Sequence, residues 1–134
     1  MADTGLVAQY EQTIIAYLED YIEGNSVEDL HRGSGAEWDL WRLHERIRGK
    51  DRRQAFLEAL ENVIRSEDTS EIVKMIAIEM SEDKGLWEVE EAVLELSERV
   101  PPMVGTYVPG TWGQLSSLAR LRVVIDSFLA SHTQ

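Results

Sequence analysis

The spacing of apolar residues is the feature that most constrains the fold of this chain. Apolar residues recur at intervals of three and four along most of its length, as at Ile14, Tyr17, Leu18 and Tyr21. This spacing places them on one face of an α-helix, whereas a half-buried strand alternates apolar and polar residues. No segment shows a clear strand pattern. The sequence therefore predicts an all-α protein.

Glycine, proline and capping residues divide this pattern into helices. We expect long helices over residues 6–22, 37–48, 51–66, 70–84, 86–99 and 115–129, and a short turn of helix within 26–35. Asp51 is the expected N-cap of the third long helix, Asp68 to Glu71 contain the start of the fourth, and Thr111 or Ser116 caps the last. Pro101 and Pro102 end the fifth.

A length of 134 residues favours one domain with one core. Short turns between the third, fourth and fifth long helices predict antiparallel neighbours, either in a bundle of five to six helices or in a short helical-repeat-like array. Residues 33–35, Gly-Ser-Gly, form a hinge candidate. Residues 100–113 contain all three prolines and form the longest irregular loop.

Negative charge is concentrated in two blocks of the sequence. Residues 1–30 contain seven acidic and no basic residues, and residues 67–98 contain eleven acidic and two basic residues, in a chain of net charge -12. Such a chain is a poor direct ligand for nucleic acid or anionic membranes, and a basic protein is the expected partner. Acidity that serves solubility alone is the alternative.

The candidate partner-binding residues are carboxylates of these two blocks and one tryptophan of the irregular loop. Trp is a residue type enriched at binding hot spots, although we expect Trp38 and Trp41 to lie in the core. The candidates are Glu19, Asp20, Glu23, Glu79, Glu82, Asp83, Glu88, Glu91, Glu95 and Trp112.

Catalytic signatures are not evident. The chain has no cysteine, no Gly-x-Ser-x-Gly sequence and no phosphate-binding loop. Glu88, Glu91, Glu95 and Glu98 resemble the paired Glu-x-x-Glu motifs of magnesium-dependent all-helical nucleotide pyrophosphatases, but those enzymes also need nearby basic residues, and this helix has none before Arg99. We expect no enzyme activity, cofactor or metal site, with a magnesium-dependent nucleotide hydrolase as the alternative.

In size, acidity, helicity and lack of catalytic motifs, the whole chain resembles the small acidic all-helical immunity proteins with which bacteria neutralise toxins in the cytosol. The resemblance implies a cytoplasmic monomer or homodimer that occludes a basic partner, such as a toxin nuclease. An inhibitor that imitates nucleic acid belongs to the same binding class. A scaffold or regulatory helical domain is the remaining alternative. No signal peptide or membrane span is expected.

Overall fold

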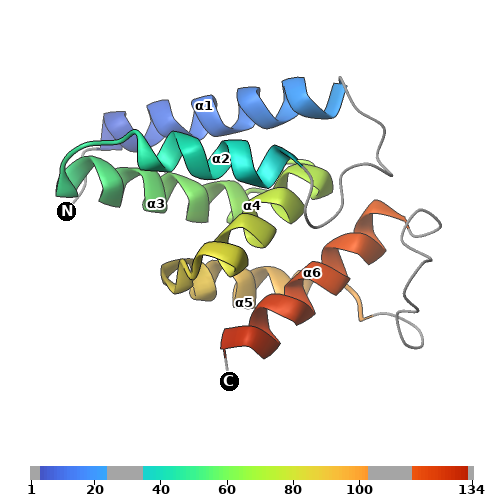
Figure 1. Ribbon diagram of the computed structural model, residues 1–134. Coiled ribbons are helices and arrows are strands. Elements are labelled where there is room, and N and C mark those ends of the chain that lie inside the picture. The colour runs from blue at the N-terminus through green and yellow to red at the C-terminus, as the bar shows by residue number, and fades with distance from the viewer. Residues whose placement is uncertain (1–3, 24–34, 103–115, 133–134) are drawn as a thin grey trace.

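Only helices occur in the part of the chain that the structure describes. The computed structural model describes residues 4–23, 35–102 and 116–132. These residues form α1 (Thr4–Glu23), α2 (Gly35–Glu45), α3 (Lys50–Arg65), α4 (Glu71–Lys84), the 3-10 helix η2 (Trp87–Val89), α5 (Glu90–Arg99) and α6 (Ser117–His132) (Figure 1). The predicted all-α class is confirmed.

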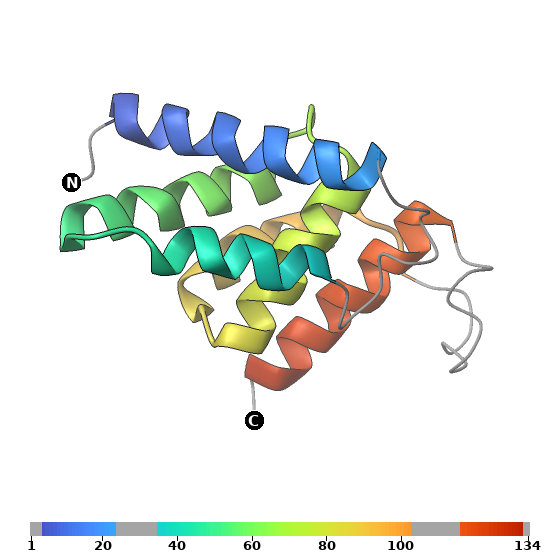
Figure 2. The same ribbon diagram turned by 45° about the horizontal axis from the view of Figure 1, so that its top comes forward.

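The six α-helices form three antiparallel pairs arranged as two stacked layers. Helices α1, α3 and α5 run in one direction, and α2, α4 and α6 run back (Figures 1 and 2). Within each layer every helix contacts the next, α1 with α3 and α3 with α5, and α2 with α4 and α4 with α6. This pattern is typical of a short helical-repeat array, in which each helix pair packs on its neighbours.

The central pair, α3 and α4, supplies more of the buried hydrophobic residues than either of the other helix pairs. On α4, ten consecutive residues from Ile72 to Ser81 are buried, because the helix contacts α1, α2, α3 and α6. A helix enclosed in this way buries polar positions that an amphipathic surface helix would turn toward water. The same hydrophobic cluster extends from Val7 on α1 to Phe128 on α6.

Local sequence signals set several helix ends as predicted. The Ser70 hydroxyl accepts a hydrogen bond from the Val73 amide at 3.3 Å and caps α4. At the other end, Gly85 has φ 67°, its amide donates to Glu82, and the Leu86 amide donates to Ser81. This paired arrangement is a Schellman motif, which satisfies carbonyls at a helix terminus.

The predicted cap of α3 was wrong. Gly49, not Asp51, precedes the first helical residue, and its φ of 95° is a conformation that favours glycine. Asp51 lies in the first turn instead, where its negative charge still interacts favourably with the helix dipole. At α6 the Ser116 hydroxyl accepts a hydrogen bond from the Ala119 amide at 3.1 Å, as one of the two alternatives predicted.

The bounds of α2 and α5 also differ from the sequence prediction. Helix α2 ends at Glu45 rather than Arg48, because the Ile47 amide bonds to the His44 carbonyl three residues earlier and tightens the last turn. Residues 86–99 do not form one α-helix, since η2 precedes α5. This turn directs α5 against α3 and α6, so the fourth and fifth long helices are not the packed antiparallel neighbours that we predicted.

Some predictions lie outside the described residues, namely the short turn within 26–35, the first two hinge residues and most of the 100–113 loop. Gly35, the third hinge residue, begins α2. Among the described helices, none combines the length and hydropathy of a segment that crosses a bilayer.

Candidate protein-binding surfaces

The outer side of α5 combines carboxylates with an exposed leucine. Its core side is formed by Ala92, Val93 and Leu96, which are buried. The opposite side carries exposed Glu91, Glu95 and Glu98, together with Leu94, whose exposed fraction is 43%, and exposed Glu88 precedes them in η2. We refer to these five residues as the α5 face. Leu94 lies three residues after Glu91 and four before Glu98, a spacing that places all three on one side of a helix.

Leu94 is apolar, so residue type alone would place it with the core residues of α5, but the structure leaves it exposed. Leu94 follows Glu91 by three residues, and this helical spacing was the sequence signal that places Leu94 on the same outer side as Glu91. An isolated exposed leucine is ordinary on a protein surface. Its setting within a ring of carboxylates is what makes this position a candidate anchor for a partner.

Glu95 differs from its neighbours because it is tied to α3. The Arg65 Nε donates to Glu95 Oε2 at 2.6 Å, and Arg65 Nη1 donates to Glu61 Oε2 at 3.1 Å. Burial raises the pKa of Glu61 above its ordinary value, although Arg65 opposes this shift. No ion pair within the described segments involves Glu88, Glu91 or Glu98, so these three carboxylates are available to a partner.

Glu79 is not a surface carboxylate, and its prediction as a partner-binding residue was wrong. Its exposed fraction is 2%, because α4 is covered on all sides. Glu82 is half-buried, and its Oε1 accepts hydrogen bonds from Ser127 at 2.8 Å and Ser131 at 3.2 Å on α6. Asp83 is exposed at the end of the same helix.

The acidic end of α1 does not join the α5 face. Glu19, Asp20 and Glu23 are exposed near the C-terminal end of α1, but α1 and α5 lie on opposite sides of α3 (Figure 1). The carboxylates of the two acidic blocks therefore lie on separate surfaces, on either side of α3. Trp112 lies outside the described residues.

No metal-binding cluster forms from the residues that the structure describes. Within these segments, no three His, Asp or Glu side chains come close enough together to hold an ion. Glu82 and Asp83, at the end of α4, do not form such a cluster with the other described residues.

A concentration of positive charge surrounds the connection between α2 and α3. Residues 42–53 contain six basic and two acidic residues, a net charge of plus 4. We call the basic set the basic corner; it consists of Arg42, Arg46, Arg48, Lys50, Arg52 and Arg53, all of them exposed. None takes part in an ion pair in the described part of the chain, whereas Arg65, Arg99 and Arg122 are all paired with carboxylates.

Residues 31–66, which lie between the two acidic blocks, contain eight basic and six acidic residues, so their overall charge of plus 2 does not single out this corner. The signal was present in the density of Arg and Lys over twelve residues of the sequence. Averaging over the longer segment, which includes Glu58 and Glu61, concealed it. The connection between α2 and α3, around which these six residues cluster in the sequence, lies at one end of the stack (Figure 1).

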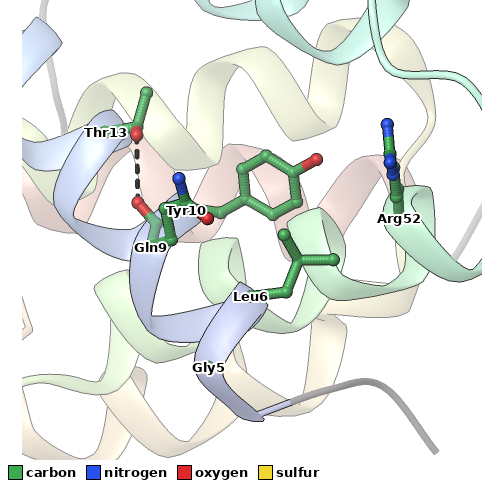
Figure 3. Close-up of a pocket in the computed structure, with 6 residues that line it drawn as sticks. All are labelled: Gly5, Leu6, Gln9, Tyr10, Thr13 and Arg52. Atoms are coloured by element: carbon green, nitrogen blue, oxygen red, sulfur yellow. Dashed lines mark hydrogen bonds between the residues drawn. The ribbon is translucent and has the colours of Figure 1, made fainter.

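A groove of about 530 Å³ between α1 and α3 adjoins the basic corner. Gly5, Leu6, Gln9, Tyr10 and Thr13 line it from α1, and Arg52 from α3. The ring of Tyr10 extends across the groove with its hydroxyl directed toward Arg52 (Figure 3). The ring is held in place by an edge-to-face contact with Phe56, with centroids 5.8 Å apart.

A row of aromatic rings continues from this groove into the interior. Phe56 contacts the His44 ring at 5.4 Å, and His44 stacks on Trp41 at 4.7 Å. Lys84 Nζ lies 5.5 Å from the centroid of Trp41, within cation–π range. Trp41 is thus half-buried against the core, in agreement with its predicted packing role, while the side chain of Trp38 lies outside the described residues.

His44 is the titratable member of this row. It is 9% exposed, and its Nδ1 has no hydrogen-bond partner in the structure. Burial lowers the pKa of His44 below its ordinary value, and the charge of Arg53 adds to this effect, while Glu45 and Glu88 oppose it. The imidazole is therefore held in its neutral form at neutral pH.

Comparison with protein-family models, with curated proteins and with solved structures gives no match to this chain.

Proposed function

We propose that the protein is a non-enzymatic binding module whose α5 face occludes a basic partner protein. The observation that carries this proposal is the exposure of Leu94 between Glu91 and Glu98, two carboxylates that no cation of the described residues neutralises. An apolar residue inside a charged rim is the arrangement by which many interfaces combine affinity with selectivity.

The two components of the face serve different steps of binding. Unpaired carboxylates accelerate encounter with a positively charged surface, and this acceleration weakens as salt is added. Leu94 would enter an apolar pocket of the partner and lengthen the lifetime of the complex. Glu95, already held by Arg65, contributes less, because pairing with a partner would require exchange of an existing ion pair.

The proposal places the acidic end of α1 in a secondary role. Glu19, Asp20 and Glu23 are exposed but lie across α3 from the α5 face. A partner of ordinary interface size, about 800 Å² on each side, covers one of these surfaces more readily than both. A cytosolic inhibitor of a basic toxin, such as a nuclease, remains the specific form that we propose, as a monomer or homodimer.

Association kinetics of substituted proteins test this proposal. The partner is first captured from host lysate at low salt and identified by mass spectrometry, and its binding is then measured by surface plasmon resonance. Glu88→Lys, Glu91→Lys and Glu98→Lys together are expected to slow association at least about tenfold and to flatten its salt dependence. Leu94→Ala is expected to accelerate dissociation about fivefold or more, with a smaller change in association.

A matched control carries three reversals on α1, at Glu19, Asp20 and Glu23. It changes the net charge by the same amount but leaves the α5 face intact, so we expect association to change much less. Equal slowing by both triple variants would show that overall charge, rather than this face, governs the encounter. An unchanged association rate in the α5 variant would remove the face from the interface.

A further inference from the structure

The basic corner is a locally positive surface on a strongly acidic protein. The chain has 25 acidic and 13 basic residues, yet all six basic side chains of the corner are exposed and outside the ion pairs of the described residues. Five of the six are arginines, whose planar guanidinium groups match phosphate oxygens in a bidentate geometry. This composition favours a phosphate-bearing ligand.

The adjoining groove adds an aromatic surface to these cations. Arg52 belongs both to the basic corner and to the lining of the groove, and the half-buried ring of Tyr10 extends toward it (Figure 3). Cations that follow a backbone, next to an aromatic ring on which a base stacks, are the two elements of single-strand recognition. A polyacidic peptide would use the cations but has no flat ring to place on Tyr10.

We propose that the basic corner and its groove bind a short single-stranded nucleic acid, with phosphates on the corner arginines and one base against Tyr10. The site consists of other residues than the α5 face, and this proposal does not depend on the function proposed for that face. It also departs from our expectation, drawn from total charge, that nucleic acid is not a direct partner.

Screening explains why a net charge of -12 permits this site. In salt of physiological strength, charges interact over a Debye length of about 8 Å. Glu19 to Glu23 follow Tyr10 by nine to thirteen residues along α1, which is roughly 14–20 Å at a rise of about 1.5 Å per residue. A strand that crosses the corner is therefore attracted by the local charge and little affected by the far end of α1.

Fluorescence anisotropy with the full chain tests the proposal. The probe is a labelled oligothymidine of about eight nucleotides, titrated at several salt concentrations. If all six cations contact phosphates, the logarithm of the binding constant falls against that of salt with a slope of about -4. Arg46→Gln with Arg48→Gln is expected to weaken binding and to make the slope shallower by about 1.4.

Substitutions in the groove separate stacking from charge. Tyr10→Leu is expected to weaken binding roughly 5- to 150-fold at constant salt slope, whereas Tyr10→Phe keeps the ring and most of the affinity. Thermal melting verifies that each variant is folded, since Tyr10 contacts Phe56. If Tyr10→Leu is not folded, Arg52→Gln is the groove variant, expected to weaken binding and lower the slope by about 0.7.

The control is Glu19→Gln with Glu23→Gln, which changes the net charge by two units as well, in the opposite direction and at the far end of α1. We expect it to alter affinity by less than about twofold, because these positions lie beyond the screening distance. Stronger binding in the control, by as large a factor as the corner variant weakens it, would attribute binding to net charge and overturn the proposal. Absence of salt-dependent binding, or equal binding of duplex DNA, would also overturn it. Equally effective competition by polyglutamate would overturn it as well, because it would assign the corner to an acidic protein.

Discussion

The α5 face and the basic corner are both exposed and charged, but they differ in what surrounds their charges. On α5 an exposed leucine lies among the carboxylates, and one of them, Glu95, is fixed by Arg65. In the corner the basic side chains have no carboxylate partners among the described residues, and the nearby nonpolar feature is the ring of Tyr10 in a groove. The first arrangement fits a protein surface, and the second fits a polyanion.

This difference shows that net charge is a poor guide to the binding surfaces of a small protein. A net charge of -12 describes neither the corner, with a local charge of plus 4, nor the separation of the acids of α1 from those of α5. Screening by salt limits the electrostatic attraction of each surface to ligands that lie close to it. Partners are therefore selected by the charges that the fold gathers within about one Debye length.

The largest expected effect distinguishes the two sides of α5. Leu96 is 3% exposed, and Leu96→Ala is expected to lower the free energy of unfolding by about 2–5 kcal/mol through lost burial and a residual cavity. Leu94→Ala, at 43% exposure, should change it by no more than about 0.5 kcal/mol. Urea denaturation measures both. Similar losses would place Leu94 in the core and remove the anchor of the α5 face.

The next effect concerns pH and the interior next to the basic corner. Because the pKa of His44 is lowered in the folded state, the unfolded state takes up this proton first as pH falls. The contribution of neutral His44 to the free energy of unfolding is fully present above the ordinary histidine pKa of about 6.5. It is lost as the pH falls through and below that value, by at most about 1.4 kcal/mol per pH unit.

His44→Phe is the variant that tests this pH effect, since it keeps a ring between Trp41 and Phe56 while removing the proton site. Unfolding free energies are compared at pH 7.5 and at about pH 5.5, below the ordinary histidine pKa. The loss of stability on acidification should be smaller in the variant than in the original protein. Parallel losses in the two proteins would assign the acid sensitivity to other groups.

The smallest effect compares a paired arginine near α5 with an unpaired one in the corner. Arg65→Gln breaks two contacts to Glu61 and Glu95 and should cost about 1 kcal/mol, the upper range for partly exposed ion pairs. Arg46→Gln breaks no ion pair of the described residues and should alter stability by less than about 0.5 kcal/mol. Thermal unfolding at low salt measures both, and equal costs would show that Arg46 has a structural role.

Much of the helical framework follows from local sequence signals. The start of α4 within Asp68 to Glu71, its end near Gly85 and the end of α5 before Pro101 were predicted from residue type, because such residues act on backbone groups within a few positions. The errors in the predicted helix boundaries also amount to only a few residues. Asp51 has a side chain suited to an N-cap. The N-cap is instead Gly49, two residues earlier, which has a positive φ.

The candidate surfaces depended more on packing. Glu88 and Glu91 were correctly placed on the outside from their helical spacing, and Glu79 was not, because α4 has neighbours on every side. Periodicity indicates which residues of a helix share a face, but it does not say how many faces are covered. Leu94 shows the converse, an apolar residue that the packing of α5 leaves exposed.

Helix formation, most helix ends and the division of charge along the chain were thus set by residues close together in sequence, since capping, proline geometry and side-chain spacing act over a few residues. The two-layer stack, the burial of Glu79, the separation of the two acidic surfaces and the approach of Tyr10 to Arg52 were decided only by tertiary packing. These features depend on which distant helices compete to bury the same core, and no local pattern specifies that choice.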